Sequence, residues 1–193
     1  TYVGLRRNSI ATVIKYDDGD FDWQLNIPMT NEAFIQDMEV NSDWLMVLVN
    51  DNNYDSSGKN SWTLLQVNKN NGNVTWQRSL SSLTSGFTYN ETAMGMALYD
   101  NNNQTMVVGN CDDMETTEVS VTVIDDTGGI VWSKILNNEF GPSYELRSAD
   151  AAVDSSGNWF VYCTYGNGGL ATSVTKLNPS GDIQWSKSYI GTC

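Results

Sequence analysis

Histidine is absent from the 193 residues of this chain, and basic residues are scarce. Without an imidazole, the common Ser-His-Asp and Cys-His nucleophilic schemes are excluded, and the commonest side-chain ligand of metals is missing. Ten lysines and arginines stand against 23 aspartates and glutamates, which gives a net charge of −13. A chain this acidic lacks the basic footprint that nucleic acid requires, so we expect no nucleic-acid partner.

Long apolar runs are also lacking. The longest, residues 44–49, is far too short to cross a bilayer, so we expect no membrane span. The chain begins with threonine rather than methionine, and we therefore expect either a mature form or an excerpt of a longer protein.

Cysteine is rare, and its spacing does not suit a metal. The three cysteines, Cys111, Cys163 and Cys193, form no CxxC pair, which argues against the usual zinc sites. In a secreted protein two of them could form a disulfide and the third could bond to another chain. Cys193, the last residue, suits a link to a second copy, but the sequence leaves the pairing open.

What the sequence does contain is one short stretch in four copies. In each copy a glycine precedes a tryptophan by four residues, and the tryptophans are 53, 56 and 53 residues apart. Self-similarity at such a period is typical of β-propeller blades. The copies are residues 16–23 (YDDGDFDW), 67–76 (VNKNNGNVTW), 124–132 (IDDTGGIVW) and 177–185 (LNPSGDIQW).

Each copy predicts a strand, a tight turn and a second strand. The turn is rich in Asn and Asp and closes on a glycine, which accepts a positive φ without steric cost. After the glycine, alternation places Phe21 and Trp23 on one half-buried face, and the other copies repeat this pattern. We expect the large indoles to fill the gaps between neighbouring sheets, at Trp23, Trp76, Trp132 and Trp185.

The strand pattern divides the whole chain. We predict an all-β, β-propeller-type fold of about 3.5 four-stranded antiparallel blades in a single domain. Residues 1–27 hold two strands and form a half blade, and the full blades are residues 28–80, 81–136 and 137–193.

Two segments resemble known propeller repeats. Residues 68–76 (NKNNGNVTW) resemble the tryptophan-docking motif of quinoprotein-like (PQQ-type) propellers. Residues 150–162 (DAAVDSSGNWFVY), followed by 177–187 (LNPSGDIQWSK), look like the SBBP-type repeat of extracellular β-propellers. The resemblance implies the fold and says little about function. The quinoprotein enzymes need a full ring, a calcium-held cofactor and a catalytic aspartate, and no motif places these here; we predict no cofactor and no enzyme activity.

The half blade predicts an open sheet edge. Three explanations stay open: the chain is an excerpt of a larger ring, it closes as an unusual small ring, or identical copies cover one another's edges. An unpaired edge is a template for another chain, and a head-to-tail contact that does not close gives a fibre.

A few polar or aromatic groups could bind a ligand. Asp37 and Asp150 align on innermost strands and could hold a cation, although the third copy has Met96 at that place. Residues 51–58 (DNNYDSSG) faintly resemble a calcium loop but lack its distal glutamate, so we assign no metal ligands. Exposed aromatic residues could bind carbohydrate, at Tyr54, Phe87 or Tyr144.

Three glycosylation sequons begin at Asn73, Asn90 and Asn103, in or beside predicted turns. With the Asn/Ser/Thr-rich, Lys-poor composition, they favour a secreted, extracellular protein. We therefore predict a non-catalytic secreted glycoprotein that is a structural or interaction module, most specifically a self-assembling fibre subunit. Its partners would be copies of itself, another extracellular protein or glycans. The alternatives are a carbohydrate- or cation-binding module and a fragment of a larger quinoprotein-like enzyme.

Overall fold

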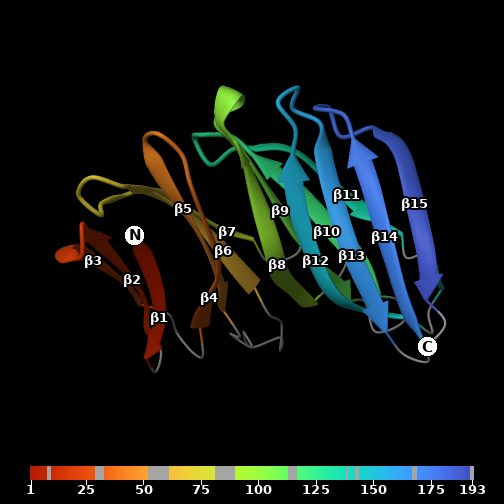
Figure 1. The fold of residues 1–193 in the computed structure, drawn as a ribbon, viewed down its shortest axis with the longest axis horizontal. Coiled ribbons are helices and arrows are strands. Elements are labelled where there is room, and N and C mark those ends of the chain that lie inside the picture. Colours follow the sequence, from red (N-terminus) through yellow and green to blue (C-terminus); the bar gives the residue numbers. More distant parts are fainter. Residues whose placement is uncertain are drawn as a thin grey trace. The chain divides into compact units, whose positions relative to one another are not determined.

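The chain folds into antiparallel sheets that belong to two compact units, Thr1–Ser81 and Ser82–Cys193. The computed structural model describes residues 1–7, 10–28, 33–51, 61–80, 90–112, 117–137, 139–141, 144–166 and 169–191. Within these ranges the strands form one three-stranded sheet and three four-stranded sheets, each a simple meander in chain order (Figure 1).

Unit 1 contains two of the sheets. The three-stranded sheet has the order β1-β2-β3, and the next has the order β4-β5-β6-β7. Their bounds are β1 Tyr2–Arg7, β2 Ile10–Asp17, β3 Asp20–Pro28, β4 Ala33–Val40, β5 Trp44–Asp51, β6 Ser61–Asn68 and β7 Val74–Leu80.

Unit 2 contains the other two sheets, β8 to β11 and β12 to β15. The only helix among the described residues is the single 3₁₀ turn η1 (Asp100–Asn102). The described residues contain no helix that is long and apolar enough to span a membrane. The strand bounds are β8 Asn90–Tyr99, β9 Gln104–Asp112, β10 Thr117–Ile124, β11 Ile130–Leu136, β12 Glu145–Val153, β13 Trp159–Gly166, β14 Leu170–Leu177 and β15 Ile183–Gly191.

The predicted all-β, propeller-type fold is confirmed, but the two-strand prediction for residues 1–27 is wrong. Tyr2–Arg7 is a third strand, paired with β2 along its whole length. Gly4 interrupts the apolar pattern there, and the structure explains it: a Cβ at Gly4 would lie 3.2 Å from a terminal methyl of Ile35. The glycine lets β1 pack closely against β4. Because the glycine turn joins β2 to β3, the three strands match the second to fourth strands of the other sheets.

The alternation predicted after each glycine is also wrong, because a β-bulge interrupts it. Trp23 pairs with Lys15, whereas Phe21 pairs with Tyr16, so Asp22 is the extra residue. Cross-strand partners share a face, and Lys15 and Tyr16 are on opposite faces. The outcome is a Trp23 side chain that is 8% exposed and a Phe21 side chain that is 62% exposed. The other copies have the same register shift just before Trp76, Trp132 and Trp185.

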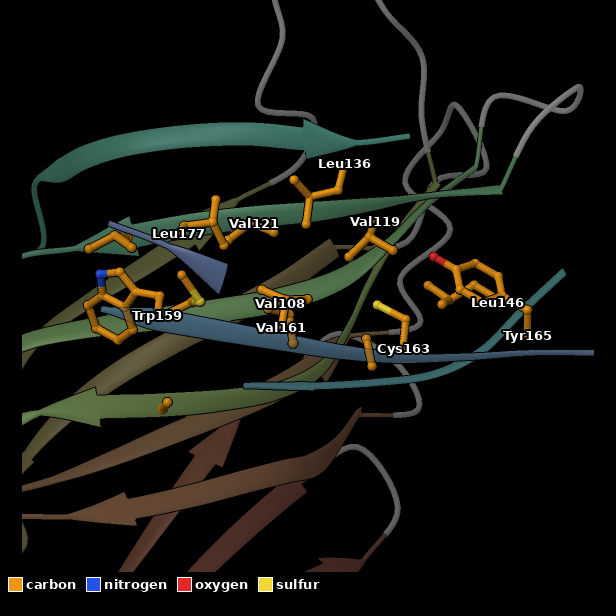
Figure 2. Packing of buried hydrophobic residues seen from close by; sticks show 14 of the residues in the cluster. Val108, Val119, Val121, Leu136, Leu146, Trp159, Val161, Cys163, Tyr165 and Leu177 are labelled. Atoms are coloured by element: carbon orange, nitrogen blue, oxygen red, sulfur yellow. The ribbon is translucent and has the colours of Figure 1, made fainter. Parts of the chain in front are cut away.

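Each unit has its own core between its two sheets. In unit 1 the core includes Val13, Trp23, Val47 and Leu65. In unit 2 valines of β9 and β10 lie against alternate residues of β13 and β14; Figure 2 shows Val108 close to Val161, and Trp159 close to Leu177. A long apolar contact between sheet faces is the packing expected of neighbouring propeller blades.

Candidate functional site

The repeated turns are built by side chains that bond their own backbone. Asn178 Oδ1 accepts hydrogen bonds from the N–H groups of Ser180 (3.0 Å) and Asp182 (2.8 Å). Asp125 Oδ1 accepts equivalent bonds from Thr127 and Gly129. This Asx geometry explains why Asn or Asp opens each turn. It leaves the turn's glycine and carbonyl groups available to a neighbouring sheet.

In unit 1 the first tryptophan docks on the turn of the next sheet. The Trp23 indole N–H donates to the Lys69 carbonyl at 3.0 Å. A Cβ on Gly72 would lie 2.8 Å from the ring atoms of Trp23, so the indole lies directly on the glycine. Gly72 has a φ of 72°, which also favours glycine. Backbone conformation and the indole contact therefore both require glycine here.

In unit 2 the same contact recurs between β11 and the β14–β15 turn. The Trp132 indole N–H donates to the Pro179 carbonyl at 3.0 Å, and a Cβ on Gly181 would lie 2.9 Å from its ring. Lys134, two residues further along the same strand, donates from Nζ to the Gly181 carbonyl. An indole and an ammonium thus hold one turn together.

Tyr99 joins the same two sheets of unit 2, β8 to β11 and β12 to β15, at another hairpin. A Cβ on Gly157, in the β12–β13 turn, would lie 2.9 Å from the ring of Tyr99. The Tyr99 hydroxyl also lies 3.4 Å from the Ser155 carbonyl. Aromatic-on-glycine docking is therefore used twice between these two sheets.

The two other tryptophans of the repeat have different surroundings. Trp76 is half-buried. Trp185, on the last strand, is 39% exposed and makes an edge contact with Phe160, the ring centroids being 6.2 Å apart. Lys187 lies over the Trp185 ring, with Nζ 5.6 Å from its centroid. The predicted gap-filling role is thus not performed by Trp185 within this unit.

The face of the last sheet that is turned away from the unit 2 core carries Trp185. Phe160, Lys176 and Trp185 form one cross-strand row, and Tyr162, Val174 and Lys187 form the next. The alternate residues of β13 enter the core instead, as Trp159, Val161, Cys163 and Tyr165. We name this face the β15 flank and define it by Phe160, Tyr162, Lys176, Trp185, Lys187 and Tyr189.

Asp37 and Asp150 lie at equivalent positions on the innermost strands, as predicted, but Met96 does not lie at the equivalent position of the third sheet. Counting cross-strand rows from the tryptophans, the equivalent of Asp150 in the third sheet is Gly95 rather than Met96. A Cβ on Gly95 would lie 2.6 Å from Asp150 Oδ1, so a small residue is required there. Oδ1 of Asp37 and of Asp150 each accepts from the next residue's N–H at 2.8 Å. Among the described residues, no group of three or more acidic residues or cysteines is placed to hold a metal.

A small polar cleft of about 250 Å³ lies between η1 and the β12–β13 turn. Tyr99, Asp100, Asn101, Asp154 and Ser155 are among its lining residues. The side-chain amide and main-chain N–H of Asn158 keep the pKa of Asp154 below its usual value, so this carboxylate stays charged.

The cysteines that the structure describes do not form the predicted disulfide. Cys111 and Cys163 are buried and are not joined to each other by a disulfide, and Cys193 lies outside the described residues. Burial raises the pKa of Cys163 to about 11, so the thiol stays neutral and unreactive. Burial also raises the pKa of its neighbour Tyr165. Both side chains belong to the core rather than to a redox site.

The other predicted binding residues are partly outside the described ranges. Tyr54 and Phe87 lie outside them, as do residues 52–60 of the calcium-like loop. Tyr144 packs on Phe140, with ring centroids 5.6 Å apart. The sequon asparagine Asn73 is exposed in its turn and Asn103 is half-buried. Asn90 opens β8.

Residues that contribute to docking but that the sequence analysis did not single out include Lys134 and Tyr99. The signal for the lysine was present: Trp-Ser-Lys occurs at residues 132–134 and again at 185–187. A repeated residue two places from a docking tryptophan shares its face of the strand, so its repetition indicates a shared role.

Comparison with known proteins supports the fold. No family model matches the chain, and no curated protein sequence matches it. Solved structures do: NanB sialidase of Streptococcus pneumoniae, in a K499G variant (TM-score 0.57, 11% identity), and a neuraminidase-like protein from A/bat/Guatemala/164/2009 (0.52, 12%). Synechocystis apocarotenoid oxygenase is also similar (0.50, 13%). The matches cover 94%, 97% and 98% of this chain but only 28%, 54% and 46% of those chains.

These similarities support propeller-type blades and leave the narrower assignment to SBBP-type or quinoprotein-like repeats as a prediction. They also correct one prediction. The chain was predicted not to be an enzyme because it lacks histidine and a recognisable catalytic motif. A sialidase and an oxygenase have the same kind of fold, so the prediction that the chain is not an enzyme is wrong. At these identities the likeness concerns the fold alone.

Proposed function

We propose that this chain is a propeller-type interaction module that acts outside the cell and associates with copies of itself. The observation that carries the proposal is the exposure of the β15 flank within the part of the chain that the structure describes. Tyr162, Trp185 and Tyr189 expose 43%, 39% and 60% of their surface, although equivalent faces between sheets are packed. Contiguous exposed apolar surface of this kind marks a protein–protein contact.

Further exposed apolar residues lie on the three-stranded sheet of unit 1. Leu5, Ile10 and Phe21 are all exposed there. A contact between this sheet of one copy and the β15 flank of the next joins two different surfaces, so it is heterologous, and it yields a ring or a filament depending on whether it closes. Two different exposed faces support the fibre subunit over a symmetric dimer.

The extracellular part of the proposal rests on the sequence. Sequons at Asn73, Asn90 and Asn103, together with the low lysine content, favour a secreted glycoprotein. The intact mass of the protein from its native source tests this part. A mass above that of the polypeptide, lowered by a glycosidase, is expected; an unmodified mass would contradict glycosylation.

Self-association is tested by sedimentation equilibrium and by electron microscopy over a wide range of concentrations. We expect the average mass to rise with concentration, and rings or filaments to be visible in the concentrated sample. A single monomeric species at every concentration would contradict the proposal.

A small-ligand site is a second candidate function, favoured by the polar cleft beside Tyr99 and Asp154. An aromatic ring next to carboxylate and amide groups suits the polar and apolar faces of a sugar. A glycan array with and without calcium tests it, and Asp154→Asn is the matched variant. Absence of binding in both conditions would remove this candidate.

A further inference from the structure

Strand β15 carries, on its exposed face, the same pair of hydrogen-bond donors, a tryptophan and a lysine, that joins the third sheet to the fourth. On β11, Trp132 and Lys134 donate to the carbonyls of Pro179 and Gly181. On β15, Trp185 and Lys187 occupy the same cross-strand positions and lie on the uncovered β15 flank. The flank therefore has the two groups needed to hold a glycine turn.

The neighbourhood of Trp185 differs from that of Trp132 in charge. Trp132 pairs across the strands with Val123, but Trp185 pairs with Lys176. Lys176 also lies over the Phe160 ring, with Nζ 5.2 Å from its centroid. Lys176 forms an ion pair with Asp154 at 3.7 Å. In a chain of net charge −13, the two lysines of the flank are a local concentration of positive charge.

The chain also contains a glycine turn of opposite charge. The β2–β3 hairpin turns through Asp18 and Gly19, flanked by Asp17 and Asp20. A Cβ on Gly19 would meet nothing within 4 Å, so no described side chain covers this glycine as Trp23 covers Gly72. The turn thus combines an open glycine with three carboxylates.

We propose that the β15 flank binds the β2–β3 hairpin of a second copy, with Trp185 on Gly19 and Lys187 at the acidic turn. The inference rests on the proposed self-association and specifies its contact. It extends an interface that the chain already forms twice internally, at Gly72 and at Gly181, and it adds charge complementarity.

The glycine turns differ in length. The ladder pairs that close them are Asp17 with Asp20, Val67 with Val74, and Leu177 with Ile183, which enclose residues 18–19, 68–73 and 178–182. The two longer turns differ by one residue, yet both receive an indole. The β2–β3 turn is tighter, so the open surroundings of Gly19, rather than a matched turn length, support the fit.

A charge exchange between two chains tests the contact. Lys187→Glu places a negative group against the acidic turn, and Asp20→Lys places a positive group against the lysines of the flank. Each variant alone should associate at least tenfold more weakly than the wild type in sedimentation equilibrium. An equimolar mixture should recover association, because the new carboxylate at position 187 then meets the new ammonium at position 20, and the native pair meets at the next contact. Asp43→Lys, an exposed change of equal charge between β4 and β5, should associate like the wild type.

The outcomes separate this inference from the proposed function. If the wild type associates and both single variants associate equally well, the β15 flank is not the contact, and the inference fails while self-association stands. If weakened variants do not recover on mixing, the hairpin is not the occupant, and another partner, such as a further blade of a longer chain, replaces it. A wild type that stays monomeric overturns both. Thermal unfolding of each variant confirms that it is folded.

Discussion

Trp132 and Trp185 occupy the same position in two neighbouring sheets of one unit, yet their surroundings differ. Trp132 lies on Gly181 and donates to the Pro179 carbonyl, while Trp185 is 39% exposed and contacts only residues of its own sheet among those described. The side chain and the strand position are the same, so the difference comes from the presence of a following sheet. A repeated residue thus stabilises the unit only where the next repeat is present to receive it.

The largest effect should follow from removing the docked indole. Trp132→Ala loses a half-buried ring and its hydrogen bond, and we expect a loss of about 3 kcal/mol in the free energy of unfolding. Urea unfolding followed by far-UV circular dichroism measures it. A loss no greater than that of Trp185→Ala would mean that the docking contact contributes nothing.

The next effect concerns the glycine that receives the indole. Gly181→Ala introduces a Cβ 2.9 Å from the Trp132 ring at a φ of 84°, and we expect a loss of about 2 kcal/mol. Gly19→Ala is the matched control, because its φ is 96° but its surroundings are open. The free energy of unfolding of this control should fall only by the cost of a side chain at positive φ, about 1 kcal/mol. Equal losses in the two variants would show that the indole does not press on Gly181.

Alkaline pH should weaken the covered face of β13. Burial raises the pKa of Cys163 from 9.0 to about 11, so the folded state favours the neutral thiol. The resulting stability is complete below pH 9 and is lost as the pH rises through 11. Between pH 9 and about pH 10 the free energy of unfolding should fall by about 1 kcal/mol more in the wild type than in Cys163→Ala. Parallel pH profiles of the two proteins would contradict the burial of this thiol.

The smallest effect is expected on the open flank. Trp185→Ala removes an exposed indole and one lysine contact, and at concentrations where the protein is monomeric it should cost less than about 0.5 kcal/mol. The same urea titration measures it beside Trp132→Ala. A loss comparable to that of Trp132→Ala would indicate that Trp185 is packed against something in the monomer.

Much of the fold could be predicted from the sequence because the repeat is local. A glycine and a tryptophan four residues apart specify a hairpin, and the period specifies the blade. The β-bulge could not be predicted, since the extra residue, such as Asp22, changes the faces without changing the pattern of residue types. The strand Tyr2–Arg7 was missed because Gly4 serves a close contact with Ile35, which is distant in sequence.

The docking contacts were only half predictable. The tryptophans carry a signal in their repetition, but the atoms that receive them are backbone carbonyls, at Lys69 and Pro179. Any residue type supplies a carbonyl, so the sequence cannot mark it. The same holds for Gly95, whose size is dictated by the carboxylate of Asp150 on a neighbouring sheet. The disulfide has no support among the described residues, since cysteine counts do not reveal that Cys111 and Cys163 are buried.

Hydrogen exchange of the indole N–H groups tests the docking contact most directly. In a sample labelled with ¹⁵N-tryptophan and diluted until it is monomeric, each of the seven indole signals can be assigned by single substitution. The Trp23 and Trp132 indoles, bonded to the carbonyls of Lys69 and Pro179, should exchange far more slowly than the Trp185 indole. Exchange of Trp132 as fast as that of Trp185 would contradict sheet-to-sheet docking through the repeated tryptophan.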